Sequence, residues 1–368
     1  MILLKLKSIR IKDVKRLHNT SISFYDKMGD KVRNRTIIVG KNGSGKTTLL
    51  EVIYGIAYLL EKGVRGIQDG IQDEEIIDFF SPGATEACFE YPVLDGTNQL
   101  LVRTGKAFQA FDKGPAPAVQ DDVNIAKGDY VGQDRMPDCL VSRTESGRKF
   151  LEKVQIAAAG LEDRTPIGNV LYFPTDRFAK FSGGSGELVN EKPEFRWCYR
   201  FNRDQDEWKG SLESFLVWLY FHDLQREKLG YPGSSKFEEF KAMINRFLEG
   251  KRITTVNTSF KVEVIESGTN RTYGLEALSS GEKQVILLLG EIYRYISVGS
   301  LILIDEPEIH LHPVWQRIFI ATLTDLCEKY DAQLILTTQS PEIAKSVMSS
   351  EVISLDNLLD ESEVSANE

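Results

Sequence analysis

The stretch that decides the fold reads Gly40-Lys41-Asn42-Gly43-Ser44-Gly45-Lys46-Thr47. It carries glycine, lysine and threonine at each position that defines a phosphate-binding loop. A β-branched run at 36–39 precedes the loop, and apolar residues recur at helical spacing from 49 to 60 after it. Because strand, glycine-rich loop and helix follow one another in this order, the stretch predicts a nucleotide-binding loop.

Each residue type in this loop suits the binding of phosphate. Gly43 and Gly45 let backbone N–H groups turn inward, and the following helix directs the positive end of its dipole at the same charge. We expect Lys46 to reach the β- and γ-phosphates and the hydroxyl of Thr47 to bind Mg²⁺. The expected nucleotide contacts in the loop are Gly40, Asn42, Gly43, Ser44, Gly45, Lys46, Thr47 and Thr48.

A second motif, Leu-Ile-Leu-Ile-Asp-Glu-Pro at 301–307, predicts a buried parallel strand that ends in two carboxylates. Sheets of α/β proteins hold their ligands at the carboxyl ends of such strands. We expect Asp305 to hold Mg²⁺ through water. We expect Glu306 to polarise the attacking water, because a carboxylate beside the metal can accept its proton.

A third motif, Leu-Ser-Ser-Gly-Glu at 278–282, lies at the start of a predicted helix that runs to 296. Ser279 is a good N-cap, and a serine with free N–H groups at a helix start forms a site for anions. Within one chain the phosphate-binding loop already contacts the γ-phosphate. The second site therefore suggests a phosphate that another copy of the chain supplies.

These motifs, with Leu-Ser-Ser-Gly-Glu-Lys-Gln at 278–284 and Ile-Asp-Glu-Pro-Glu-Ile-His-Leu-His-Pro at 304–313, resemble an ABC-type ATPase of the branch that contains SMC, RecF and OLD proteins. The resemblance is strongest to the compact OLD-like ATP-binding proteins of bacteria. It implies two ATP molecules between two subunits, with Ser279 and Gly281 acting in trans on the nucleotide of the other subunit. It also implies ATP and Mg²⁺ as cofactors and a homodimer or higher homo-oligomer. The motifs cover only the two ends of the chain.

The chain departs from that family after the predicted strand 333–338. The family usually places there a histidine that touches the γ-phosphate, whereas this chain has Gln339. Glutamine donates and accepts hydrogen bonds but carries no charge at neutral pH. Either hydrolysis is slow and switch-like, which we favour, or Glu306 suffices for ordinary hydrolysis. The predicted catalytic residues are Glu306, Lys46 and Gln339.

Two further groups of residues leave alternatives open. His310 and His312 could bind a metal with Glu308, but a spacing of two points them apart on a helix, and Pro313 marks a turn into the helix 314–330. The resemblance implies a position beside the dimer interface, where hydrogen bonding is the simpler role. Arg177, after an apolar strand, either senses phosphate or forms a structural ion pair.

The predicted fold class is α/β: a P-loop NTPase of the ABC-type head kind, with a mixed or parallel sheet core, a β-rich lobe and an inserted helical lid. A hairpin at 84–104, loops at 112–147, a hinge at 182–186 and a helical hairpin formed by 211–229 and 236–248 support this division. The aromatic stripes of that helical hairpin predict a small private core, and an exposed remainder could dock a partner. The predicted segments are 1–61 (core with the loop), 62–180 (lobe), 181–255 (lid), 256–356 (core with the other motifs) and 357–368 (acidic tail).

Composition narrows the class of protein. The chain has 368 residues, 42% of them hydrophobic, without an apolar run long enough to cross a bilayer or a leader-like N-terminus, so we expect a cytoplasmic location without membrane contact. The cysteines are too scattered for zinc or redox motifs; they are Cys88, Cys139, Cys198 and Cys327. The tail from Asp356 onward is acidic and expected to fray.

The net charge of −9 argues against blanket adhesion to nucleic acid but permits a local basic patch. That patch either contacts DNA or is a solvated strand face whose lysines protect an edge. Its members are Lys5, Lys7, Arg10, Lys12, Lys15, Arg16, Arg33 and Arg35.

Two functions follow as hypotheses. In the first, the ATPase acts directly on DNA in repair or chromosome maintenance. In the second, which we favour, its ATP state controls a separate effector protein, a nuclease or toxin, in bacterial anti-phage defence. The sequence lacks a long heptad arm to reach along DNA and an appended nuclease domain, so a compact head would need a partner to have an output. A transporter subunit is a distant third hypothesis, because the insertion before 278 is long for that role.

Overall fold

The centre of the computed structural model is a six-stranded parallel sheet, in the order β10-β9-β14-β15-β5-β16. The structure describes residues 4–64, 83–93, 96–104, 140–141, 168–177, 197–202, 212–231, 235–309 and 311–358. The strands of this sheet are β5 (Arg35–Val39), β9 (Val170–Phe173), β10 (Cys198–Arg200), β14 (Leu301–Asp305), β15 (Gln333–Thr338) and β16 (Val352–Ser354). β15 lies between β5 and β14 and is parallel to both. The carboxyl ends of β5, which leads into the phosphate-binding loop, and of β14, which carries Asp305, therefore lie at the same edge of the sheet. The predicted α/β class with a parallel core is confirmed.

A second, antiparallel sheet has the order β2-β1-β6-β7-β8. Its strands are β1 (Lys5–Lys12), β2 (Thr20–Ser23), β6 (Ala84–Val93), β7 (Gly96–Thr104) and β8 (Leu140–Val141); a short ribbon of β3 (Tyr25–Asp26) and β4 (Lys31–Val32) lies beyond β2 in sequence. The predicted hairpin at 84–104 is confirmed as β6 and β7. It does not stand apart from the N-terminal strand, because β6 pairs directly with β1.

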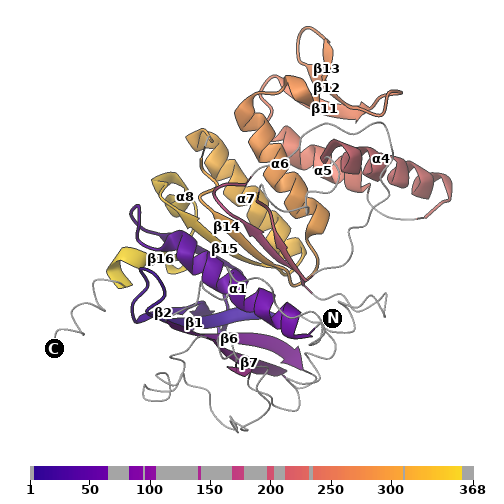
Figure 1. Cartoon of the computed structure of the whole chain (residues 1–368). Coiled ribbons are helices and arrows are strands. Elements are labelled where there is room, and N and C mark those ends of the chain that lie inside the picture. The colour runs from indigo at the N-terminus through magenta and orange to yellow at the C-terminus, as the bar shows by residue number, and fades with distance from the viewer. Residues whose placement is uncertain are drawn as a thin grey trace.

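The two faces of the parallel sheet bury different elements, because side chains alternate along a strand. Tyr172, Leu303 and Ile335 pack with α1 (Lys46–Val64) and the antiparallel sheet. Neighbouring residues such as Phe173 and Ile304 pack with α6 (Ser280–Tyr295) and α7 (Pro313–Lys329). Helices α1 and α6 therefore lie on opposite faces of the sheet (Figure 1).

The lid, which we define as residues 212–231 and 235–274, packs on α6. It contains α4 (Leu212–Lys228), α5 (Lys236–Asn245) and a three-stranded sheet of β11 (Lys251–Val256), β12 (Val262–Glu266) and β13 (Thr272–Gly274). The two predicted helices are confirmed. The small separate core that the sequence predicts for these two helices is not confirmed. Phe237, Phe240 and Phe247 belong instead to the same buried cluster as α6 and the parallel sheet. The reason is that α6 packs against both the lid and the sheet.

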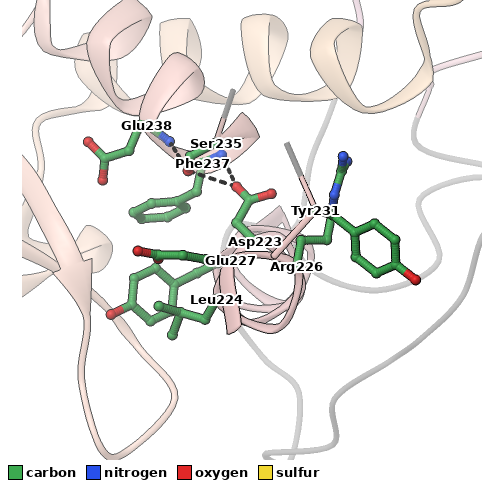
Figure 2. A pocket seen from close by; sticks show the side chains of 9 residues that line it. Asp223, Leu224, Arg226, Glu227, Tyr231, Ser235, Phe237 and Glu238 are labelled. Atoms are coloured by element: carbon green, nitrogen blue, oxygen red, sulfur yellow. Dashed lines mark hydrogen bonds between the residues drawn. The ribbon is translucent and has the colours of Figure 1, made fainter. Parts of the chain in front are cut away.

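The outer side of the lid carries a groove between α4 and α5 with a volume of about 370 Å³. Phe237, Leu224, Glu227 and Asp223 line it, and Asp223 accepts hydrogen bonds from the backbone N–H of Phe237 (2.7 Å) and the hydroxyl of Ser235 (2.9 Å) (Figure 2). These bonds fix the approach of α5 to α4.

Several sequence predictions concern segment boundaries or residues that the structure does not describe. β9 and β10 lie within the segments predicted as lobe and lid but pair in the core sheet. The segment boundaries remain a prediction. The hinge at 182–186, His310 and the loops at 112–147, apart from β8, lie outside the described residues. None of the helices that the structure describes is long and apolar enough to span a membrane.

The side chain of Gln333 joins the two sheets. Its amide nitrogen donates to the carbonyl oxygen of Leu6 (2.9 Å), and its oxygen accepts from the N–H of Leu6 (2.7 Å). Gln333 is only 1% exposed. This reciprocal pair satisfies backbone groups of β1 at the point where β1 changes register against β6.

Replacing Gln333 with leucine should lower the free energy of unfolding by about 2–4 kcal/mol, because both buried backbone groups of Leu6 would lose their partner. Urea denaturation measures the change. The control is Gln225→Leu, an exposed position on α4, for which we expect less than about 0.5 kcal/mol. Similar values for the two variants would contradict this role of Gln333.

Candidate nucleotide-binding and hydrolysis site

The glycine-rich loop has the backbone conformation that its glycines permit. Gly43 and Gly45 have φ angles of 79° and 93°, in the region that side chains disfavour. A Cβ at Gly43 would lie 2.8 Å from Nη1 of Arg16, and one at Gly45 would lie 2.7 Å from Cδ2 of Leu17. The turn after β1 thus packs directly on the loop, and α1 begins at Lys46.

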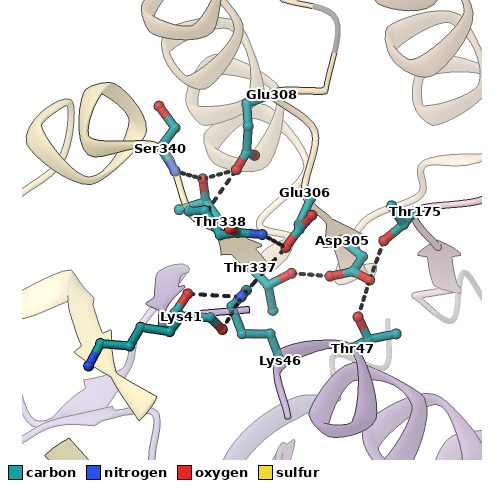
Figure 3. Close-up of polar contacts among 12 residues, drawn as sticks. Lys41, Lys46, Thr47, Thr175, Asp305, Glu306, Glu308, Thr337, Thr338 and Ser340 are labelled. Atoms are coloured by element: carbon teal, nitrogen blue, oxygen red, sulfur yellow. Dashed lines mark hydrogen bonds and ion pairs between the residues drawn. The ribbon is translucent and has the colours of Figure 1, made fainter. Parts of the chain in front are cut away.

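The side chain of Lys46 lies at the centre of the site. Its ammonium donates to the carbonyl oxygens of Gly40 and Lys41, each at 2.9 Å, and lies 3.5 Å from Oε1 of Glu306. Only 4% of the side chain is exposed. Lys46 therefore connects the loop to the end of β14 (Figure 3).

Asp305 is fully buried, at 0% exposure, and three threonine hydroxyls surround its carboxylate. Thr47 and Thr175 donate to the same oxygen, Oδ2, at 2.7 and 2.6 Å, and Thr337 donates to Oδ1. The three threonines come from α1, from the turn after β9 and from β15, and Figure 3 shows them converging on one point. Hydroxyl and carboxylate oxygens are the ligands that Mg²⁺ takes.

Glu306 follows in a strained backbone conformation, with a φ of 44°. Such a conformation is uncommon for a residue with a side chain and persists only where the surroundings enforce it. The N–H of Glu306 donates to the carbonyl of Thr337 at 3.0 Å, and its carboxylate accepts a hydrogen bond from the amide of Gln339. The strain turns the Glu306 carboxylate toward Lys46 and Gln339.

Arg177 stabilises the backbone of this turn through hydrogen bonds. Its guanidinium donates to the carbonyl oxygens of Asp305 (2.7 Å) and Glu306 (3.1 Å). Burial lowers the pKa of the guanidinium, and the nearby carboxylates of Asp305 and Glu308 oppose that shift. In the described contacts Arg177 is therefore a backbone clamp, which neither of the two predicted roles anticipated.

Thr175 and Arg177 lie outside the three motifs; of the two, only Arg177 is a candidate from the sequence, as a phosphate sensor or in a structural ion pair. A signal was present, because Thr175-Asp176-Arg177 lies just after a short apolar strand, as Asp305-Glu306 lies at the end of another. The position of that strand beside β14 could not be read from the sequence. Without knowledge of the pairing between β9 and β14, the sequence does not show that Thr175 and Arg177 contact Asp305.

The turn after Glu306 binds the end of β15. Oε1 of Glu308 accepts hydrogen bonds from the hydroxyl of Thr338 (2.7 Å) and the N–H of Gln339 (2.8 Å). His312 is the N-cap of α7, with Pro313 in the first turn, as predicted. Among the residues that the structure describes, no group of three or more His, Cys, Asp or Glu could hold a metal. Glu308 and His312 therefore take part in hydrogen bonds, and the metal alternative, which includes His310, extends outside the described residues.

The signature residues lie apart from this cluster. Ser279 is exposed and caps α6 in a reciprocal capping box: its hydroxyl oxygen accepts from the N–H of Glu282, and the Glu282 carboxylate accepts from the N–H of Ser279. The N-cap prediction is confirmed. Ser279 and Gly281 belong to the helix on the face of the sheet opposite α1.

The residues of the loop fit a nucleotide phosphate and Mg²⁺. The hydroxyl of Ser44 is buried but has no hydrogen-bond partner, which is uncommon for a buried polar atom and suits a ligand-binding loop. The positive φ angles of Gly43 and Gly45 aid the turning of backbone N–H groups toward an anion. Mg²⁺ is usually held by one or two carboxylates together with substrate phosphates, so Thr47 and Asp305 form a sufficient protein contribution.

The prediction that the acidic tail frays from Asp356 onward is wrong at Asp356. This residue does not fray with the acidic tail, because the N–H of Lys41 donates to both oxygens of its carboxylate, at 3.0 and 3.2 Å. The parallel pairing of β16 with β5 brings this residue to the start of the loop. Residues 359–368 lie outside the described chain.

The basic patch is largely neutralised by carboxylates. Most of its members form ion pairs, which are Lys5–Asp331, Lys7–Glu90, Arg10–Glu86, Lys15–Glu51 and Arg35–Glu351. Cations that already have carboxylate partners attract phosphate less. The patch is thus better explained as a paired strand face than as a DNA contact.

Comparison with known proteins agrees with the geometry. A family model described as "AAA domain, putative AbiEii toxin, Type IV TA system" matches residues 193–345, and one described as "AAA domain" matches residues 8–136. The retron Vc95 probable ATPase of Vibrio cholerae is 25% identical, over 94% of this chain and 74% of that protein. The Septu protein PtuA of Bacillus thuringiensis is 38% identical over 25% of this chain and 26% of its own.

Among solved structures, an SMC head bound to the C-winged helix domain of ScpA aligns with 93% of this chain and 92% of its own, with a TM-score of 0.47 and 14% identity. Two AAA-domain family models thus match separate parts of the chain, and the chain is similar to retron ATPases, so the resemblance predicted from the motifs is confirmed at that level. An ATPase role is therefore supported.

Arg177→Ala should lower the free energy of unfolding by about 2–4 kcal/mol, because two buried carbonyl groups lose a charged donor. It should also reduce ATP turnover, because the two hydrogen bonds that hold the carbonyl groups of Asp305 and Glu306 in the strained turn are lost. Chemical denaturation and a phosphate-release assay measure the two effects. The control is Arg317→Ala, which removes an exposed pair with Glu342 and should change stability by about 1 kcal/mol or less. An Arg177 variant as stable and active as the control would refute the clamp.

Proposed function

We propose that the chain is an ATP-hydrolysing switch that encloses Mg²⁺-ATP between two copies and whose nucleotide state controls a separate effector protein. The observation that carries the proposal is the convergence of Lys46, Thr47, Asp305, Glu306 and Gln339 at one edge of the parallel sheet. These groups come from three separate parts of the sequence. Their convergence supplies a cation, a metal-binding pair and a base in one place.

In this proposal the loop binds the triphosphate and Mg²⁺ neutralises charge on the phosphate oxygens. Lys46 exchanges its carbonyl partners for β- and γ-phosphate oxygens. Gly40, Asn42, Gly43, Ser44, Gly45 and Thr48 surround the phosphates, and Thr47 and Asp305 hold the metal. The Thr175 hydroxyl keeps the Asp305 carboxylate oriented, because it shares the same oxygen with Thr47.

Hydrolysis then uses the strained carboxylate. Glu306 accepts a proton from water as the water oxygen bonds to the γ-phosphorus, and the bond from that phosphorus to ADP breaks. Gln339 donates to the Glu306 carboxylate and so orients the base. Because Gln339 cannot take a positive charge, it gives less charge stabilisation than histidine would, which suits a slow switch.

The second copy supplies what the first lacks. The signature helix α6 lies on the opposite face of the sheet from α1, and the exposed hydroxyl of Ser279 has its oxygen occupied by the Glu282 N–H. The hydroxyl proton therefore remains available to a phosphate outside its own chain. Ser279 and Gly281 in trans would complete each site of a two-fold dimer.

An effector is favoured over direct action on DNA for two reasons. The basic strand face is paired with carboxylates. Relatives with overlapping sequence are named for retrons and for Septu, and one family model is named for a toxin system. We propose a nuclease or toxin as the effector, in bacterial anti-phage defence.

Mixing two inactive variants tests the shared site. Lys46→Ala should abolish ATP binding, whereas Ser279→Arg should leave binding intact and remove hydrolysis. In an equimolar mixture half of the dimers are mixed and hold one intact site, so turnover should recover to roughly a quarter of the wild-type value. If the two variants are shown to dimerise and ATP turnover does not recover at any mixing ratio, the site is not shared in trans.

Glu306→Gln should bind ATP without hydrolysing it and hold the closed dimer, which makes it the bait for the effector. Purified with ATP from its native host, it should retain a nuclease or toxin, whereas Lys46→Ala, which cannot bind ATP, should not. Mass spectrometry identifies the partner. Wild-type turnover that duplex DNA stimulates, without any protein partner, would favour the DNA hypothesis instead.

A further inference from the structure

We propose that Lys251 of the lid is a positioning residue for the signature helix, and that it sets the catalytic competence of the other subunit's site through Glu282. This inference rests on the proposed function, because it concerns the trans-acting signature. It adds a residue that none of the three motifs contains and makes the lid part of the hydrolytic cycle.

The contact itself is bidentate and part-buried. The ammonium of Lys251 lies 3.0 Å from each carboxylate oxygen of Glu282. Glu282 is only 4% exposed. One of its oxygens also accepts the N–H of Ser279 at 2.7 Å. Lys251 and Ser279 therefore share one carboxylate, and a movement of the ammonium acts directly on the capping box.

The electrostatics agree with a charged, oriented carboxylate. Burial alone would raise the pKa of Glu282, but hydrogen bonds from Ser279 and from Lys251 outweigh it and lower the pKa. An ionised Glu282 binds the N–H of Ser279 more strongly than a neutral one. Lys251 thus supports the charge that fixes the conformation of Ser279.

The conformation of Ser279 matters because of its hydroxyl. The oxygen accepts from the N–H of Glu282 at 3.3 Å, and the hydroxyl can still donate its proton to a group outside the capping box. A displacement of about 1 Å at a phosphate-binding group can cost on the order of 100-fold in rate. Small changes at Glu282 are therefore sufficient to matter in the trans site.

Lys251 is also tied to the rest of the lid. It is the first residue of β11, and Ile253 on that strand exchanges two hydrogen bonds with the side chain of Asn245 at the end of α5 (2.7 and 3.2 Å). Thr255 donates to the hydroxyl of Tyr220 on α4 at 3.1 Å. Both lid helices are thus bonded to the strand that carries Lys251, and a shift of the lid reaches the signature through one side chain.

The variant Lys251→Met removes the charge and keeps the aliphatic stem. We expect ATP binding by the loop to be unchanged and turnover to fall roughly 10-fold to 100-fold. Lys251→Arg, which keeps a charged donor, should restore most of the turnover. The matched control is Lys241→Met, a lid lysine whose ammonium contacts Glu238 and the carbonyl oxygen of Thr254 on β11 but not Glu282; it should be as active as wild type.

Mixing experiments separate positioning from a merely structural role. Mixed with Lys46→Ala, the Lys251→Met variant should recover turnover to about a quarter of wild type, because one site pairs its intact loop with an intact signature. Mixed with Ser279→Arg it should not recover, because both variants damage the signature. Recovery with Ser279→Arg, wild-type turnover of Lys251→Met, or an equal loss in Lys241→Met would overturn the inference.

The reference mixture of Lys46→Ala with Ser279→Arg identifies the source of a failure. If that mixture stays inactive, the shared site itself is wrong and the inference falls with it. If the reference recovers and the Lys251 mixtures do not follow the expected pattern, only the role of Lys251 is wrong.

Discussion

A buried carboxylate at the end of a parallel strand is the constraint on which this structure depends. Asp305 is wholly enclosed, and a buried charge must be matched by donors to be tolerated. Three threonines from three different elements provide them. α1, the turn after β9 and the end of β15 must therefore all reach one point, and this requirement fixes the relative positions of the loop, the sheet edge and Gln339.

The same sheet separates the chemical parts into two groups. One face buries α1 and the antiparallel sheet, and the other buries α6, α7 and the lid. The phosphate-binding loop and the signature serine consequently belong to different layers of one molecule. The hydrogen bonds between Gln333 and Leu6 connect the antiparallel sheet to the parallel one. The separation explains why a shared site between two copies suits this architecture.

Local signals made much of the fold predictable. The loop has glycines where φ must be positive, and Ser279 and His312 lie at helix starts with the flanking residues typical of caps. Such features depend on residues a few positions apart. For the candidate site, the motifs indicated the loop and the carboxylates, and the structure brings them within contact distance. Their catalytic roles remain proposals.

The remainder depends on long-range pairing that one sequence does not reveal. Thr175 and Arg177 reach Asp305 because β9 lies beside β14, although about 130 residues separate them in sequence. Asp356 reaches Lys41 because β16 pairs with β5. The sequence left DNA contact and a solvated strand face both open for the basic patch, because its carboxylate partners, such as Glu86 and Asp331, lie far away in the chain. The prediction of a separate core in the lid was also wrong because of a contact that is distant in sequence. The aromatic residues of the lid pack on α6.

The central claim is that no single copy contains a complete site, and the concentration dependence of turnover tests it most directly. Turnover per chain should fall as the wild-type protein is diluted through the range in which light scattering shows the ATP-bound dimer to dissociate. ATP binding per chain should stay constant over the same range, because the loop lies within one copy. Turnover per chain that is the same for the monomer as for the dimer would contradict the account.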